Sequence, residues 1–252
     1  MKSASLFLAL SAALSFGAHA ADLTVSAAAS LTDAFNDIGK AYTEQYPQDK
    51  VFFNFAGSGV LLKQLQNGAP ADVFASADQL RMDTAEKEQL IKPESRANFA
   101  QNALVLIAPK DSHIAPQDLA ALVEHAEIKR IAIANPESVP VGTYSKTALE
   151  KAGLWEKIGE RNIPTQNVRQ SFDYVARGEV EAGFVYATDA AMMKDKVKTL
   201  FQVPLDEALS YPIAVSANSQ APEAAQRFVQ FVLSEQGQNI LRNYGFLAPD
   251  AK

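Results

Sequence analysis

The sequence is poor in the residues that most often carry enzyme chemistry. Its 252 residues include no cysteine and only three histidines, two of which, His113 and His125, lie in a polar stretch that we interpret as solvated surface. Without cysteine the chain has no disulfide and no CxxC site, and it also lacks an HExxH motif and a carboxylate-rich metal loop. These absences leave little basis for a resident metal centre or for catalysis.

Long apolar runs are also scarce, and the one that stands out lies at the N-terminus. Lys2 precedes an apolar stretch over residues 6–16, and Ala18-His19-Ala20 has the A-x-A pattern of a cleavage site. The stretch is shorter than the roughly 20 residues that a transmembrane helix needs. We therefore predict a signal peptide at residues 1–20 and export to the periplasm. We expect a mature chain without stable membrane insertion, and the lack of cysteine leaves no site for lipid attachment.

Basic residues are fewer than acidic ones. The net charge is −6, and loss of Lys2 with the signal peptide would leave 22 basic against 29 acidic side chains, a net charge of −7. This balance disfavours nucleic acid or an anionic membrane surface as a partner. Any anion site must therefore be made by local hydrogen-bond donors, against the overall field of the protein.

Short apolar runs alternate with amphipathic helical patterns along most of the chain, which is typical of an α/β protein. The runs predict strands at 23–28, 51–55, 71–76, 103–108, 129–134, 181–186, 198–203 and 211–216. The helical patterns lie at 31–46, 59–66, 144–151, 168–177, 222–233 and 234–244. If the chain has two lobes, residues 103–108 and 210–216 are the best candidates for the strands that cross between them.

Two of the predicted strands run directly into a serine that opens a helix. Residues 23–30 read LTVSAAAS, and residues 51–58 read VFFNFAGS. The first N–H groups of a helix have no partner within it, and together with the helix dipole they favour an anion. Ser30 and Ser58 are also ordinary N-cap residues, and Ser30 with Asp33 resembles a capping box. Because ligands of open α/β sheets collect at the carboxyl ends of strands, the pair favours an anion-binding site that does not transform its ligand.

A nucleophilic role for Ser58 is the competing interpretation. The segment Gly57-Ser58-Gly59 lacks the outer glycine of a G-x-S-x-G elbow, because residue 56 is alanine, and it lacks the lysine of a P-loop. No histidine lies near it in the sequence to act as a base. A serine hydrolase is therefore disfavoured.

Other candidate positions are less distinctive. Residues 139–144 (VPVGTY) lead into a helix, Asn167 is the expected cap of another helix, and Tyr186 ends an apolar run. Tyr186 is either a half-buried aromatic residue that needs one hydrogen-bond partner or a hydroxyl directed into a cleft. The sequence gives no reason to place Arg81 or Arg169 in a site, and we interpret both as solvated.

Several segments resemble one known family. AAASLTDA at residues 27–34, GAPADVFASADQ at 68–79, VPVGTY at 139–144 and YGF at 244–246 are similar to periplasmic molybdate-binding proteins, the ModA family of ABC-transporter solute receptors. The resemblance extends over nearly the whole mature chain. Where some relatives have a run of serines, this chain has Gly57-Ser58-Gly59.

The resemblance implies a type II periplasmic binding protein fold, with two α/β lobes, mixed sheets and a ligand cleft between them. We expect residues 21–102 and 212–252 to form one lobe and residues 103–211 the other. The family's ligand contacts correspond here to the hydroxyls and N–H groups of Ser30 and Ser58, the backbone N–H groups of Val141 and Val168, and the hydroxyl of Tyr186.

The implied ligand is molybdate or tungstate, with the metal present only inside the oxyanion and with no cofactor. A receptor for sulfate or another tetrahedral oxyanion is the main alternative. The implied partner is an ABC permease in the inner membrane, and we expect a monomer.

Overall fold

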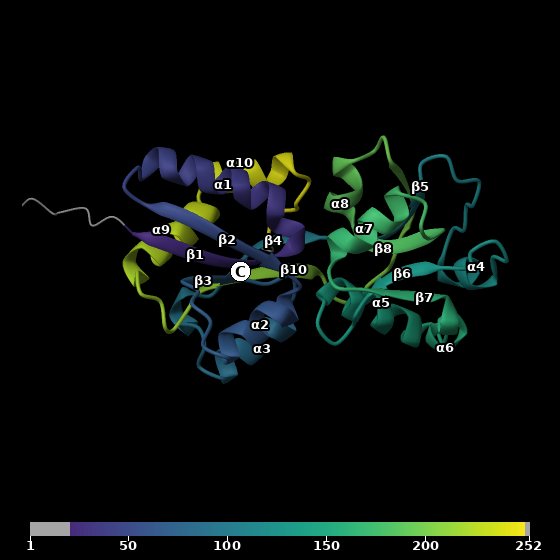
Figure 1. Cartoon of the computed structure of the whole chain (residues 1–252), viewed down its shortest axis with the longest axis horizontal. Helices are drawn as coiled ribbons and strands as arrows, with labels where there is room; N and C mark the ends of the chain where they lie inside the picture. The colour runs from purple at the N-terminus through teal and green to yellow at the C-terminus, as the bar shows by residue number, and fades with distance from the viewer. Residues whose placement is uncertain (1–20, 250–252) are drawn as a thin grey trace, which may run out of the picture.

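The computed structural model describes residues 21–249, which form two lobes, each built on a five-stranded sheet (Figure 1). The predicted signal peptide at residues 1–20 lies outside the described residues. Between residues 21 and 249 no helix has the length and apolar character needed to cross a bilayer. The predicted α/β class with two mixed sheets is confirmed.

The first lobe contains the strands β1 (Asp22–Ala28), β2 (Lys50–Ala56), β3 (Val73–Ala75), β4 (Ala97–Asn102) and β10 (Leu209–Val215). Their order is β2-β1-β3-β10-β4, and β10 runs antiparallel to both of its neighbours, whereas β1 pairs in parallel with β2 and β3. Ala28 lies opposite Ala56 in the register, so β1 and β2 end at the same edge of the sheet.

Helices cover both faces of this sheet. One face carries α1 (Thr32–Gln45), α9 (Pro222–Leu233) and α10 (Glu235–Asn243), and the other carries α2 (Ser58–Gln66) and α3 (Gln79–Lys87) (Figure 1). Phe35 and Phe228 pack together on the first face, and Leu61 and Met82 belong to a separate buried cluster on the second face. Because apolar side chains are buried on both faces, the central strands read as nearly continuous apolar runs.

The second lobe contains β5 (Leu104–Pro109), β6 (Ile131–Ala134), β7 (Asn162–Thr165), β8 (Ala182–Tyr186) and β9 (Val197–Gln202), in the order β7-β6-β8-β5-β9. The helices α5 (Pro140–Lys151) and α6 (Trp155–Ile158) lie on one side, and α7 (Val168–Ala176) and α8 (Ala187–Met192) lie on the other (Figure 1). The short α4 (Leu119–Glu124) lies at the far end.

Between residues 21 and 249 the chain passes between the lobes twice. The first crossing follows Asn102, since β4 belongs to the first sheet and β5, which begins at Leu104, belongs to the second. The second crossing lies between Gln202 and Leu209, because β10 pairs along its length with the first sheet. The boundary expected at residues 211 and 212 therefore falls inside β10, two residues after this strand begins.

Several elements were not predicted. β4 and β7 are edge strands; β4 reads ANFAQN with little alternation, and β7 contains Pro164. An edge strand tolerates proline and polar residues, so it carries a weak signal. Helix α3 reads QLRMDTAEK, which is too polar to show an apolar stripe.

Candidate functional site

A small cavity lies where the two lobes meet, at the strand ends and helix starts that the sequence singled out. Its volume is about 10 Å³. The first lobe lines it with Ala28, Ala29, Ser30, Ala56, Gly57, Ser58 and Ala77, and the second lobe lines it with Val139, Pro140, Asn167, Val168 and Tyr186. Among these described lining residues there is no charged side chain. The polar groups that face the cavity are therefore hydroxyls, one carboxamide and backbone amides.

Ser30 lies in a short 3-10 turn, η1 (Ala29–Leu31), between β1 and α1. The prediction that its hydroxyl caps the following helix is wrong, because α1 begins at Thr32, Leu31 is the N-cap and no side chain caps it. The hydroxyl instead lies 3.1 Å from the hydroxyl of Tyr211 in β10. A long-range contact has therefore taken the place of the local one.

Ser58 also differs from the predicted cap. It is the first residue of α2, and Gly57 is the N-cap. The Ser58 hydroxyl oxygen accepts a hydrogen bond from the backbone N–H of Ala77, 3.0 Å away, and the side chain is fully buried. Because its oxygen accepts that bond, the hydroxyl proton is left to donate elsewhere. No base contacts this serine among the hydrogen bonds of residues 21–249, so the arrangement lacks the dyad of a serine hydrolase.

The two glycines around Ser58 permit the lobes to come close together. A Cβ at Gly59 would lie 2.7 Å from the carbonyl oxygen of Ser138, and a Cβ at Gly57 would lie 3.1 Å from the same atom. The backbone N–H of Gly59 donates to that oxygen at 2.9 Å. This contact joins α2 of the first lobe to the loop before α5 of the second lobe, and it explains the Gly-Ser-Gly sequence by close backbone approach.

Val141 and Val168 lie at two helix starts of the second lobe. Pro140 is the first residue of α5 and has no N–H, so the N–H of Val141 is the first donor of that helix. Val168 is the first residue of α7 and lines the cavity, whereas Val141 itself is not among the lining residues. The predicted cap at Asn167 is confirmed, since its side chain accepts from the N–H of Gln170 at 3.0 Å.

Tyr186 ends β8 and brings a hydroxyl to the cavity. The side chain is 1% exposed, and its hydroxyl has no hydrogen-bond partner within residues 21–249. The sequence left two interpretations of Tyr186 open. Its position in the cavity lining fits the one in which the hydroxyl is directed into a cleft. Burial raises the pKa of Tyr186 well above its usual value of 10, so the hydroxyl keeps its proton and is a hydrogen-bond donor.

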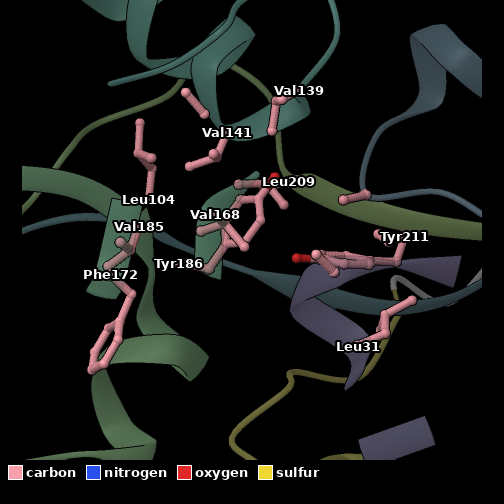
Figure 2. Close-up of a cluster of buried hydrophobic side chains, with 14 of the residues drawn as sticks. Leu31, Leu104, Val139, Val141, Val168, Phe172, Val185, Tyr186, Leu209 and Tyr211 are labelled. Atoms are coloured by element: carbon pink, nitrogen blue, oxygen red, sulfur yellow. The ribbon is translucent and has the colours of Figure 1, made fainter. Parts of the chain in front are cut away.

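The close-up of the buried side chains shows how these residues face one another. Val141, Val168 and Tyr186 come from the second lobe, and Leu31 and Tyr211 lie on the first-lobe side (Figure 2). The rings of Tyr186 and Tyr211 are in edge contact, with centroids 5.9 Å apart. The site is thus assembled from both lobes, and four of the five expected residues line one cavity.

Arg81, which the sequence left on the surface, is a buried link between the lobes. It extends from α3 of the first lobe and pairs with Asp78 at 2.6 Å. Its guanidinium also donates to the carbonyl oxygens of Pro136 and Glu137, each 3.0 Å away, and to the hydroxyl of Thr143 at 2.9 Å. All three acceptors belong to the second lobe, so Arg81 connects the two lobes beside the cavity without lining it.

Arg169 also connects the lobes, from the second lobe to the first. It extends from α7 of the second lobe, lies 3.1 Å from the buried Asp189 of its own lobe, and pairs at 2.8 Å with Asp33 of the first lobe. Burial raises the pKa of the Asp189 carboxyl to about 6, although the neighbouring Arg169 lowers it. Neither arginine was recognisable from the sequence as a link between lobes, because their partners in the opposite lobe lie far away along the chain.

The chemistry available at the cavity is hydrogen-bond donation to an acceptor. Two serine hydroxyls, a protonated tyrosine and the first residues of α2 and α7, Ser58 and Val168, line it. Residues 21–249 contain no group of three or more His, Asp and Glu side chains placed to hold a metal ion. A site with donors and without cations or carboxylates suits a small anion that has no proton of its own.

Two α/β lobes joined by two crossings, with a donor-lined cavity between them, define the class of the periplasmic solute-binding proteins. The family model described as "Bacterial extracellular solute-binding protein" matches residues 23–247, and the chain belongs to this family.

Curated relatives include the "Molybdate-binding protein ModA" of Haemophilus influenzae, which is 34% identical over 235 residues that cover 92% of each chain. The protein of the same name from Escherichia coli is 35% identical over 245 residues, covering 93% of this chain and 95% of that one. The structure of the Azotobacter vinelandii periplasmic molybdate-binding protein is similar in fold, with a TM-score of 0.80 at 23% identity, and the match covers 90% of this chain and all of that one. The resemblance expected from the sequence motifs is confirmed.

Proposed function

We propose that this chain is a periplasmic receptor that captures molybdate or tungstate between its lobes and delivers it to an ABC permease in the inner membrane. The observation that carries the proposal is the buried Tyr186 hydroxyl, which lines the cavity and has no partner within residues 21–249. Relatives that are about one third identical over most of their length are named molybdate-binding proteins, which supports the same ligand here.

The donor set explains why such an anion would bind. Molybdate presents only acceptor oxygens, and the proposed shell offers the hydroxyls of Ser30, Ser58 and Tyr186 and the N–H groups of Val141 and Val168. Hydrogen bonds to a charged acceptor are shorter and stronger than neutral ones, and backbone dipoles in a water-poor cavity can hold an anion without a cation. The metal belongs to the cargo, and the proposal requires no resident cofactor.

Selectivity against protonated oxyanions follows from the same shell. Hydrogen phosphate would place an O–H group where the lining offers no carboxylate to accept it, at a cost of roughly 1–3 kcal/mol. Sulfate has no proton at neutral pH, so its rejection must come from the size of the cavity. A receptor for sulfate or another tetrahedral oxyanion is therefore the alternative ligand assignment.

Calorimetric titration of the ligand-stripped protein with molybdate, repeated in the presence of excess sulfate, tests the proposal. We expect a tight one-to-one isotherm that sulfate does not displace. Heat with sulfate and none with molybdate would keep the receptor role and overturn the ligand. Labelling by a serine-reactive probe would revive the hydrolase interpretation, which the missing base at Ser58 disfavours.

The division of donors between the lobes predicts that the ligand favours the closed state. Ser30 and Ser58 belong to the first lobe, whereas Val141, Val168 and Tyr186 belong to the second. We expect scattering curves of the protein to show a more compact particle when molybdate saturates it. A monomer that presents this closed shape to the permease completes the proposal, and curves that do not change with ligand would contradict it.

A further inference from the structure

A chain of buried polar side chains lies behind Ser30, outside the five expected ligand contacts. Asn102 ends β4 at the first crossing between the lobes, and Tyr211 lies in β10, beside β4 in the sheet. The Tyr211 hydroxyl lies 3.1 Å from the Ser30 hydroxyl and accepts a hydrogen bond from the Asn102 amide nitrogen at 3.3 Å. Asn102, Tyr211 and Ser30 are all buried, so bulk water does not compete for these bonds.

The direction of each proton in this chain can be assigned by counting donors. The side-chain oxygen of Asn102 accepts from the backbone N–H of Ala103 at 2.9 Å, which fixes the orientation of the amide. The amide nitrogen, which can only donate, then faces the hydroxyl oxygens of Thr188 at 2.9 Å and Tyr211 at 3.3 Å. Because the Asn102 nitrogen cannot accept, Ser30 is the one acceptor that these bonds offer to the Tyr211 hydroxyl. Ser30 accepts this hydrogen bond and keeps its own proton for donation.

We propose that Asn102 and Tyr211 are positioning residues that turn the Ser30 hydroxyl proton into the cavity, so that this serine serves only as a donor toward the ligand. The inference rests on the proposed function, because it concerns how the same site selects its anion. Burial raises the pKa of Tyr211, so the tyrosine keeps the proton that the arrangement needs.

The Ser58 hydroxyl is also left as a donor, through a single hydrogen bond from the backbone. The backbone N–H of Ala77 donates to the Ser58 oxygen, so the Ser58 hydroxyl proton remains available for the ligand. A backbone amide cannot reverse its direction, whereas a chain of hydroxyls can. Ser30 is therefore the one of the two serines whose role as a donor depends on residues that can be substituted.

Loss of the tyrosine hydroxyl would release this constraint. A free Ser30 hydroxyl can rotate and offer a lone pair, and it could then accept the O–H of a protonated oxyanion. Asn102 and Tyr211 would thus contribute to selectivity as well as to affinity. A purely structural role for Tyr211 predicts no change in the preference between deprotonated and protonated anions.

A double-mutant cycle between Tyr211→Phe and Ser30→Ala tests the inference, with molybdate as the probe and inorganic phosphate as the protonated competitor. In the wild-type background, we expect Tyr211→Phe to weaken molybdate binding roughly 3- to 10-fold, the value of one hydrogen bond. In the Ser30→Ala background, the same substitution should change the affinity by less than about twofold, because Tyr211 acts through Ser30. The ratio of molybdate to phosphate affinity should fall in Tyr211→Phe.

Tyr42→Phe is the matched control. Tyr42 is equally buried, and its hydroxyl donates to Asp49 at 2.7 Å, away from the cavity. It reports the effect of losing a buried tyrosine hydroxyl on folding, and we expect it to leave both affinities unchanged. If Tyr211→Phe is only partly folded, the affinity ratio still decides, because the active fraction affects both ligands equally.

The outcomes separate the two proposals. Tight molybdate binding by the wild type, with equal effects of Tyr211→Phe in both backgrounds, overturns the positioning role and leaves the receptor intact. An unchanged affinity ratio in Tyr211→Phe has the same meaning. A wild-type protein that does not bind molybdate overturns the proposed function and this inference together.

Discussion

Gly59 offers a way to test the closing of the two lobes without touching a ligand donor. It is the second residue of α2, and its N–H donates to the carbonyl oxygen of Ser138 in the other lobe. A methyl group on Gly59 would lie 2.7 Å from that oxygen and 2.8 Å from the Ser138 Cα. Both atoms belong to the backbone, so they cannot rotate away. Gly59→Ala should therefore disfavour the closed arrangement of the lobes and leave an open arrangement unaffected.

Two effects of known size make the prediction quantitative. Within a helix, alanine is more favourable than glycine by about 0.8–1 kcal/mol, so the first lobe should gain stability. Closing the lobes against an extra methyl group should cost about 1–3 kcal/mol, the usual range for overpacking. The expected result for Gly59→Ala is molybdate binding that is weaker by roughly 5- to 150-fold in a protein that is no less stable without ligand.

Calorimetric titration and ligand-free thermal unfolding measure the two quantities separately. Lys63→Ala is the control, because Lys63 is an exposed residue of the same helix and makes no contact with the second lobe in the hydrogen bonds and ion pairs of the described chain. It should retain wild-type affinity. Wild-type affinity in Gly59→Ala would refute the argument, and so would a fall in its unfolding midpoint, since that result indicates damage to the lobe itself.

Further predictions concern the donors and the charges around the cavity. Ser30→Ala and Ser58→Ala should each lose about 1–3 kcal/mol of molybdate binding in calorimetry, because a charged acceptor loses a donor; wild-type affinity in both would place the site elsewhere. Asp33→Asn removes the first-lobe partner of Arg169, a partly exposed pair worth about 0.2–1 kcal/mol, so stopped-flow measurements should show dissociation faster by roughly 1.4- to 5-fold with unchanged association. The pKa of Asp189, raised to about 6 by burial, exceeds the value near 3.9 of an unfolded chain, so the folded protein holds a proton that the unfolded chain has lost. Stability should therefore fall as the pH rises from about 4 to 6, and Asp189→Asn should flatten that slope in thermal unfolding; an equal slope in both proteins would contradict the assignment.

The alternation of strands and helices was predictable because it depends on local apolar periodicity. The strands β1, β2, β5, β6 and β8 agree with their apolar runs to within two residues at each end. Strands with mostly buried residues, such as β1, β5, β6 and β8, carry the strongest such signal, since both faces need apolar side chains. The edge strands β4 and β7 have polar residues or proline in place of an apolar run and were missed, whereas the edge strands β2 and β9 were predicted.

The helix caps predicted at Ser30 and Ser58 are wrong for a different reason. The sequence offered each serine a nearby N–H group of its own helix, and this local bond is the usual choice. In the structure, Ser30 contacts Tyr211, 181 residues away, and Ser58 accepts from Ala77, 19 residues away. Sequence patterns indicate only which hydrogen bonds a residue can make with its neighbours along the chain. They do not predict a distant partner that replaces a helix cap. The same argument covers the contacts that Arg81 and Arg169 make with the opposite lobe.

Two opposing contributions decide whether the lobes close without ligand, and Tyr186 belongs to the unfavourable one. Arg81 and Arg169 favour closure through their contacts across the cleft. Against them, closure buries the Tyr186 hydroxyl without a partner in the protein, which costs about 1–3 kcal/mol. An oxyanion removes this cost by accepting a hydrogen bond from the hydroxyl, so it shifts the balance toward the closed state.

Tyr186→Phe separates these contributions, because it deletes the unpaired hydroxyl and keeps the ring that packs against Tyr211. Without ligand, the variant should be more compact than the wild type in small-angle scattering, since closure no longer buries an unsatisfied donor. Its molybdate affinity should nevertheless fall, because the anion loses one of its donors. A variant that is no more compact than the wild type would show that the hydroxyl does not oppose closure. Weaker binding would then reflect the lost hydrogen bond alone.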